Sequence, residues 1–174
     1  MNENLLLTPD KDPMGRAIAD YFAHGKAQRL RVFSSQFDED EIPVKDLFRT
    51  RQHMSPLEQT ALKLARGRIL DVGAGSGCHS LCLQEAGLEV DAIDISPLSV
   101  EVMRQRGVHN ALHANLFDPH FCASYDTILM LMNGSGVIGK INRLPHFFRR
   151  MKQLLRPGGQ ILMDSSDLKA KIGR

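Results

Sequence analysis

Short apolar runs and amphipathic stretches alternate along most of this chain. Five apolar runs predict strands, at residues 68–72, 88–93, 110–113, 125–131 and 160–163. Segments with apolar residues three or four positions apart predict helices, over residues 78–85, from residue 97 onward and over residues 144–155. Strands that alternate with helices of this length indicate βαβ units around a parallel sheet. The sequence therefore predicts an α/β fold with a doubly wound, mostly parallel sheet.

A capping signal precedes the first of these strands. Ser55 can cap a helix that begins with Pro56, and Glu58 can complete a capping box. This helix leads directly into the first predicted strand. We therefore divide the chain into an N-terminal helical extension over residues 1–54 and an α/β domain over residues 55–174, together forming one globular unit.

The extension has weaker patterns of its own. Asp12-Pro13 is a helix start and Gly25 a helix stop, and a second short helix is expected over residues 26–33. The acidic stretch at 37–41 is expected to be a solvated loop. This N-terminal extension could fold over a ligand as a lid, with Tyr21 and Arg49 as side chains that could reach it.

Composition narrows the possible functions. The chain has 174 residues, of which 43% are hydrophobic and 24% charged, and its formal net charge is +2. This predicts one globular domain with a buried core. The mild charge is no strong signal for nucleic acid or a membrane surface, because both attract clustered Lys and Arg. A local basic group is expected to form the wet face of a helix: Arg149, Arg150, Lys152 and Arg156.

Cysteines and apolar runs bear on the compartment. The three cysteines do not have the spacing of a metal site or a disulfide framework: Cys78, Cys82 and Cys122. We therefore expect no metal and expect the cysteines to be reduced thiols. The N-terminus lacks the basic start of a signal peptide, and no apolar run is long enough to span a membrane. We expect a cytoplasmic protein.

Candidate chemistry begins in the glycine-rich loop after the first strand. Ligands of open parallel sheets bind at the carboxyl ends of strands, near the point where the strand order reverses. Glycines there let the backbone approach a ligand closely, and the first turn of the following helix offers free N–H groups. The candidate binding residues of this loop are Gly73, Ala74, Gly75 and Gly77.

Polar residues after the next two strands suit a nucleoside. Asp94 comes about twenty residues beyond the loop, the separation at which an acid reaches ribose hydroxyls. Asn115 offers a donor and an acceptor to a base edge. Apolar neighbours that could sandwich a purine are Ile95, Leu116 and Met130.

Two details favour a sulfonium cofactor over NAD. The glycines follow the pattern G-x-G-x-G, so the third comes one position earlier than in the dinucleotide fingerprint. Asp71 also places a negative charge where a pyrophosphate would lie, and like charges in a half-buried cleft repel. A cationic sulfonium and ammonium would be favoured there.

Four motifs together resemble those of class I S-adenosylmethionine-dependent methyltransferases, in particular bacterial enzymes that act on small molecules. They are residues 69–77, 91–97, 125–129 and 154–159. The resemblance implies a Rossmann-like fold and S-adenosylmethionine as cofactor. It implies that the glycine loop wraps the methionine moiety with help from Asp71, that Asp94 binds the ribose, and that Asn115 meets the adenine. The family often has Asp in place of Asn115, and the amide oxygen can still meet the adenine amino group.

The resemblance also points to an acceptor side. Asn133, after the fourth predicted strand, and Ser165, after the fifth, are the substrate-side candidates. No catalytic residue is assigned, since methyl transfer needs a base only if the acceptor must lose a proton. The proline-rich signature of enzymes that methylate exocyclic or amide nitrogens is absent, which favours a small-molecule acceptor. An RNA or protein methyltransferase, and a cofactor-binding module with little activity, are the alternatives.

The family resemblance raises a question about the end of the sheet. Such sheets normally add two strands after the fifth, and this sequence ends at Arg174. We therefore expect a fold truncated after the fifth strand. The uncovered edge predicts either a shortened protein or a homodimer whose second chain covers it.

Overall fold

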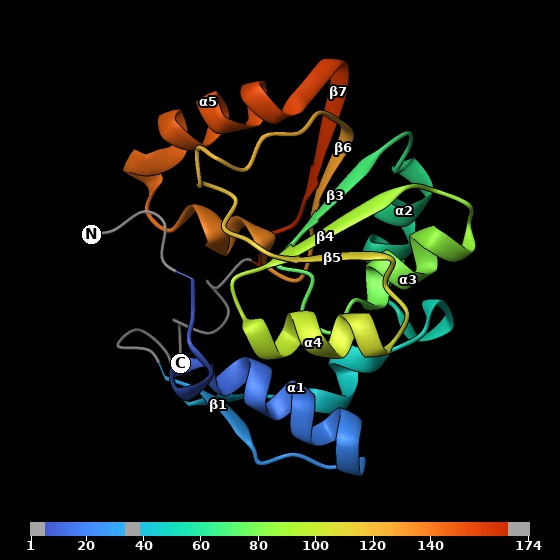
Figure 1. The fold of residues 1–174 in the computed structure, drawn as a ribbon, viewed down its shortest axis with the longest axis vertical. Coiled ribbons are helices and arrows are strands. Elements are labelled where there is room, and N and C mark those ends of the chain that lie inside the picture. Colours follow the sequence, from blue (N-terminus) through green and yellow to red (C-terminus); the bar gives the residue numbers. More distant parts are fainter. Residues whose placement is uncertain (1–5, 34–38, 167–174) are drawn as a thin grey trace.

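The computed structural model describes residues 6–33 and 39–166 (Figure 1). At its centre is a five-stranded sheet in the order β5-β4-β3-β6-β7, and every neighbouring pair is parallel. The strands are β3 (Ile69–Val72), β4 (Val90–Asp94), β5 (Asn110–His113), β6 (Tyr125–Met130) and β7 (Leu155–Met163). The order reverses between β3 and β6, so ligands are expected at their carboxyl ends. The predicted doubly wound, Rossmann-like sheet is confirmed.

Helices cover both faces of this sheet. On one face lie α2 (Pro56–Leu64), α3 (Cys78–Glu85) and α4 (Pro97–Gln105), packed on strand residues such as Ile69 and Ala92. On the other face, α5 (Leu144–Leu154) packs Phe147 and Met151 against Leu70 and Ile128. Successive residues of a strand face opposite sides of the sheet. Because helices cover both sides, all four residues of β3 are buried. This is why the strands appear in the sequence as unbroken apolar runs.

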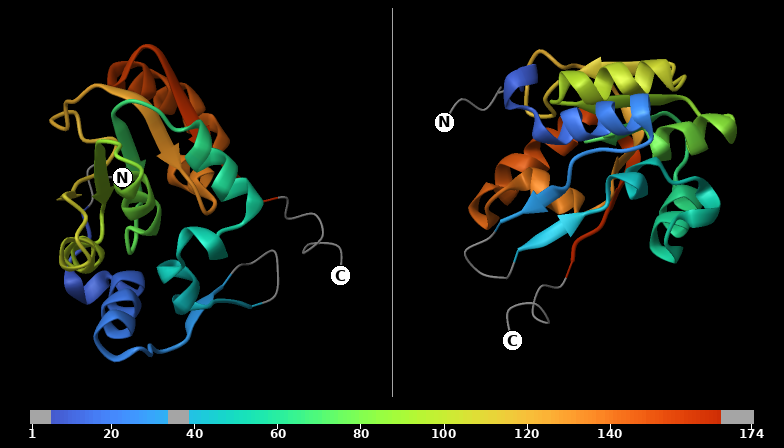
Figure 2. Two further views of the ribbon diagram at one scale, coloured as in Figure 1. Left: turned by 90° about the vertical axis from the view of Figure 1, so that its right-hand side faces the viewer. Right: turned by 90° about the horizontal axis from the view of Figure 1, so that it is seen from below.

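The N-terminal segment packs along α4, as Figures 1 and 2 show. Helix α1 (Pro13–His24) ends at Gly25, which has φ of 67°. Ile18 of α1 packs with Leu47 of the 3₁₀ helix η2 (Val44–Phe48) and with Val102 of α4. The division of the chain at residue 54 stays a prediction.

Two expectations for this segment are wrong. The helix expected over 26–33 is replaced by a strand, β1 (Leu30–Val32), which pairs antiparallel with β2 (Asp40–Ile42). The acidic stretch is therefore not entirely loop, and residues 37 and 38 of it lie outside the described residues. Opposite charges meet at the hairpin, where Arg29 Nε donates to Glu41 Oε2 at 2.7 Å.

Two further expectations need correction. A fold lacking its last two strands is not supported, because the described residues contain seven strands, two of which form the β1–β2 hairpin outside the main sheet. The basic group near α5 is not wholly solvated either. Arg150 is buried and donates to Leu116 O at 2.6 Å and Asp118 O at 2.8 Å, which secures the loop after β5. In the described part of the chain, no helix is long and apolar enough to cross a membrane.

Candidate functional site

The loop after β3 turns sharply and brings its backbone to β4. The Gly73 N–H donates to Ile93 O at 2.9 Å. Gly73 has φ of 68°, and a Cβ at this position would meet no atom within 4 Å. A Cβ at Gly77 would lie 2.8 Å from Val108 Cγ2. Gly73 therefore leaves open space beside the loop, whereas Gly77 permits close packing beneath it.

Asp94 lies at the carboxyl end of β4 and braces this loop. Its Oδ2 accepts the Gly75 N–H and its Oδ1 accepts the Ser96 N–H, both at 2.9 Å. Burial raises the pKa of Asp94, while these two hydrogen bonds lower it. Each carboxylate oxygen has a further lone pair, so the side chain can also accept from ligand hydroxyls.

A first cavity, of about 330 Å³, opens between the ends of β4 and β5 and the segment after β6. Gly73, Asp94 and Asn115 line it together with an apolar wall: Ile95, Leu116, Phe117 and Val137. Asn115 Oδ1 accepts the Phe117 N–H at 2.9 Å, and the Arg143 guanidinium lies 5.4 Å from the centre of the Phe117 ring. A cavity lined by an acid and by apolar side chains suits a nucleoside.

A second cavity, of about 260 Å³, adjoins the first and shares Gly73 and Asp94 with it. Its polar residues include Asp71 and His79. Its outer wall is apolar and comes from the N-terminal segment and the chain after β6: Met14, Ile18, Ile42, Leu47, Leu131 and Met132. The N-terminal segment thus completes this cavity.

Asp71 gives the second cavity its charge. Its Oδ2 accepts the Ser80 hydroxyl at 2.6 Å, and burial raises the pKa of Asp71, with partial opposition from nearby His79. Asp94 also lines this cavity. Two acids facing one space favour a cationic ligand and disfavour a pyrophosphate.

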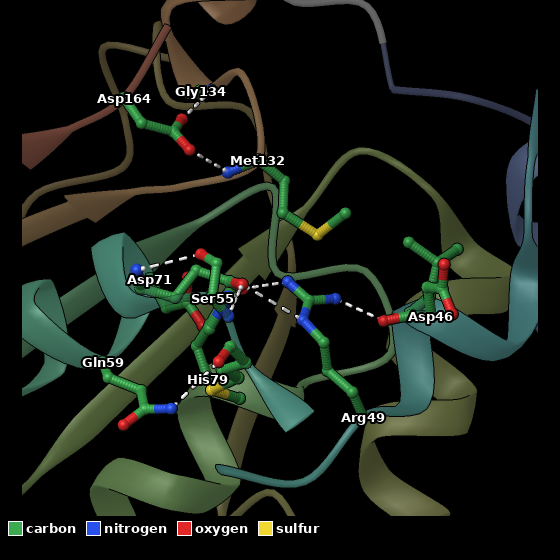
Figure 3. A network of polar contacts seen from close by, with 12 residues as sticks. Asp46, Arg49, Ser55, Gln59, Asp71, His79, Met132, Gly134 and Asp164 are labelled. Atoms are coloured by element: carbon green, nitrogen blue, oxygen red, sulfur yellow. Dashed lines mark hydrogen bonds and ion pairs between the residues drawn. The ribbon is translucent and has the colours of Figure 1, made fainter. Parts of the chain in front are cut away.

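Arg49 and His79 meet at one buried carboxylate, that of Glu58 (Figure 3). Arg49 forms an ion pair with Glu58, His79 Nε2 lies 2.8 Å from Glu58 Oε1, and the Ser55 N–H donates to Glu58 Oε2 at 2.9 Å. Burial raises the pKa of Glu58, but the bonds from His79, Arg49 and Ser55 hold it below its usual range. This network joins the N-terminal segment to α2 and α3 and fixes His79 beside the second cavity.

Most of the predicted cofactor residues line one or both cavities: Asp71, Gly73, Ala74, Gly75, Asp94, Ile95, Asn115 and Leu116. Gly77 and Met130 line neither, since Gly77 caps α3 and Met130 is buried in the core beneath α5. Asn133 and Ser165 also lie outside both cavities, and Asn133 Oδ1 accepts the Ser166 hydroxyl at 2.6 Å. The ligand-binding roles of all these residues stay predictions.

The residues of the outer wall of the second cavity were not predicted from the sequence. Tyr21 and Arg49, considered as lid residues, line neither cavity, because Tyr21 packs against the Phe48 ring and Arg49 pairs with Glu58. Met14 and Ile18 reach the second cavity instead. Their spacing on one apolar helix face was the available signal, but it indicates burial without showing against what.

Comparisons with known proteins place the chain among methyltransferases. A family model described as "Methyltransferase domain" matches residues 70–163. The crystal structure of an S-adenosylmethionine-dependent methyltransferase from Bacteroides fragilis, in complex with S-adenosyl-L-homocysteine, is similar with a TM-score of 0.94 and 67% identity. That likeness covers 98% of this chain and 71% of the other.

Curated relatives are more distant. A ubiquinone biosynthesis O-methyltransferase from Xanthomonas oryzae pv. oryzae is 24% identical over 151 residues, covering 83% of this chain and 62% of that protein. A cypemycin N-terminal methyltransferase from a Streptomyces species is 28% identical over 102 residues, covering 57% of this chain and 42% of that protein. The chain thus spans less than two thirds of the length of these relatives.

Proposed function

Because this chain belongs to the methyltransferase domain family and has S-adenosylmethionine as its cofactor, we propose that its protein methylates a small-molecule acceptor. The observation that carries this proposal is the pair of adjoining cavities that share Gly73 and Asp94. We assign the adenosine to the cavity lined by Asn115 and Phe117. We assign the methionine moiety to the cavity lined by Asp71 and Met132.

This chain's residues would bind and align the reactants. When bound, S-adenosylmethionine supplies an electrophilic methyl group on a good leaving group. Asp94 accepts from the ribose hydroxyls, and Asp71 provides negative charge near the ammonium and sulfonium. The loop at Gly73 lets the backbone follow the ligand without a side chain in the way. Alignment of donor and acceptor is the main contribution that such a transfer requires.

The outer wall of the second cavity supports an acceptor with an apolar body. Met14 and Ile42 come from the N-terminal segment, and Met132 comes from the loop after β6. Apolar walls with few polar groups are typical of sites that hold small molecules. The relative from Xanthomonas oryzae is named for ubiquinone biosynthesis, which agrees with a small acceptor, whereas cypemycin's enzyme is named for an N-terminus.

Calorimetry with S-adenosylmethionine, S-adenosyl-L-homocysteine and NAD tests the cofactor assignment. We expect the first two to bind and NAD not to bind. Asp94→Ala should weaken binding by at least about tenfold, because it removes charge-assisted hydrogen bonds. Glu101→Ala, an exposed acid on α4, is the matched control and should bind normally. Failure of the wild-type protein to bind either sulfur ligand would contradict the assignment.

The acceptor is tested with methyl-labelled S-adenosylmethionine and cell extract separated into small-molecule, RNA and protein fractions. Label in the small-molecule fraction is the expected result. Label in RNA or protein would favour those acceptors instead. Binding without transfer to any fraction would favour a cofactor-binding module.

A further inference from the structure

The chain after β6 contains an unusual backbone turn. Met132 and Asn133 have φ of 61° and 62°, and they are the non-glycine residues with positive φ in the described ranges. Left-handed backbone places Cβ too close to the neighbouring carbonyl oxygen, so two such residues in succession are unfavourable. A turn of this kind persists only where surrounding contacts impose it.

Asp164, the residue after β7, supplies such contacts. Strands β6 and β7 run side by side with Met130 opposite Met163, and the Asp164 N–H donates to Met130 O at 3.2 Å. The Asp164 carboxylate then accepts twice, from the Met132 N–H at 3.0 Å and from the Gly134 N–H at 3.1 Å (Figure 3). One carboxylate therefore bonds the backbone on both sides of Asn133.

The turn also determines where the Met132 side chain lies. Met132 lines the second cavity together with Asp71 and Gly75, yet 44% of its surface is exposed, so little packing holds it there. A Cβ at Gly134 would lie 2.7 Å from Met130 Cβ, so the chain runs close to the end of β6. The position of the Met132 side chain thus depends on its backbone, which Asp164 bonds directly.

We propose that Asp164 is a positioning residue for methyl transfer. By accepting the N–H groups of Met132 and Gly134, it secures the left-handed turn and keeps the Met132 side chain against the methionine end of the cofactor site. Asp164 itself lines neither cavity and acts through this turn. The inference rests on the proposed function, because it requires the methionine moiety in the cavity that Met132 lines.

A matched pair of variants tests this role by calorimetry with S-adenosyl-L-homocysteine. Asp164→Asn replaces one accepting oxygen with a donor, and we expect binding to weaken by about tenfold, the equivalent of one charge-assisted hydrogen bond. Asp126→Asn is the control, because Asp126 also accepts a backbone N–H, from Arg68 at 2.7 Å, but at the opposite end of β6. It should bind within about twofold of wild type. Equal affinity of Asp164→Asn and wild type would overturn the proposal.

A rescue separates positioning from general stability. Glycine adopts positive φ without cost, so the double variant Asp164→Asn with Asn133→Gly needs less help to form the turn. We expect the double variant to bind S-adenosyl-L-homocysteine at least about threefold more tightly than Asp164→Asn alone, in line with the cost of one strained residue. No regain would mean that Asp164 does not act through the turn, and the proposal would fail.

A measurement on the wild-type protein covers the case in which Asp164→Asn does not fold. Hydrogen exchange should show protection of the Met132 and Gly134 amides, and exchange at the rate of a free peptide would overturn the proposal. Calorimetry on the wild-type protein also separates the proposed cofactor site from the proposed role of Asp164. If it fails to bind S-adenosyl-L-homocysteine, both are contradicted, whereas normal binding in Asp164→Asn contradicts only the role of Asp164.

Discussion

Asp71 is a buried carboxylate that faces the second cavity, and its ionised form opposes folding when no cation is bound. Burial raises its pKa above the ordinary value of 3.8, so the folded chain binds this proton more tightly than the unfolded chain. The contribution of Asp71 to stability therefore falls as pH rises from 3.8 through the raised pKa.

Asp71→Asn cannot ionise and still accepts from Ser80. Without cofactor, it should have a higher free energy of unfolding than wild type at pH 7, and the gain should vanish at acid pH. Urea unfolding at a series of pH values measures this difference. The same variant should bind S-adenosylmethionine more weakly, because it removes a negative charge near the cationic ligand. Such a residue favours binding at the expense of stability. A variant less stable than wild type at neutral pH would contradict this account.

At the scale of elements, α1 and α4 are joined through their N-terminal caps. Asp12 Oδ1 accepts the Gly15 N–H at 2.8 Å, and Asp12 Oδ2 accepts the hydroxyl of Ser96, the cap of α4, at 2.5 Å. A Cβ at Gly15 would lie 2.2 Å from Asp12 Oδ2 and 2.3 Å from Ser96 Oγ. A side chain at this position must displace the Asp12 carboxylate and the Ser96 hydroxyl, which breaks the bond that joins the two caps.

Gly15→Ala should therefore destabilise the protein, although the same exchange in an exposed helix is stabilising by about 1 kcal/mol. We expect a loss of about 1–3 kcal/mol, typical of overpacking, and faster proteolysis of the N-terminal segment. Arg16→Ala, at the next and exposed position, is the control and should be nearly neutral. Thermal unfolding measures the stability of both variants. If Gly15→Ala were more stable than wild type, the proposed link between the caps of α1 and α4 would be wrong.

Local signals explain which elements could be predicted. Asp12, Ser55 and Ser96 each stand before a proline, and helices α1, α2 and α4 begin at those prolines. The β1–β2 hairpin was missed because three-residue strands carry almost no periodicity and their pairing is set by distant residues. The turn at Met132 was missed for a related reason. Met132 and Asn133 are not glycines, so no local signal marks the turn, and its conformation depends on Asp164, which lies far along the chain.

At the scale of the whole molecule, the cofactor side could be predicted better than the acceptor side. Gly73, Asp94 and Asn115 each follow a strand, and a parallel sheet brings such residues to one edge. Met14 and Ile42 reach the site from another part of the chain, and no local pattern encodes that approach.

The edge of the sheet gives a prediction at the same scale. Among the described strands, β7 pairs only with β6 and stands at the edge. Exposed edges invite pairing, so the homodimer stays our prediction. Size-exclusion chromatography with light scattering should give twice the chain mass of 19.4 kDa. A clean monomer that does not aggregate would contradict it.

The position of β3 in the sheet also sets the order in which the protein can fold during translation. Its partner β4 follows soon after it, but its other partner β6 emerges from the ribosome only later. Until then one side of the central strand has unpaired N–H and C=O groups, and the nascent chain is at its most prone to aggregate. Gly73 and Asp94 have both been synthesised by this stage, whereas Met132 and Asp164 follow later in the chain. The ribose side of the cofactor site can thus form first, and the methionine side is complete only once the last strand is in place.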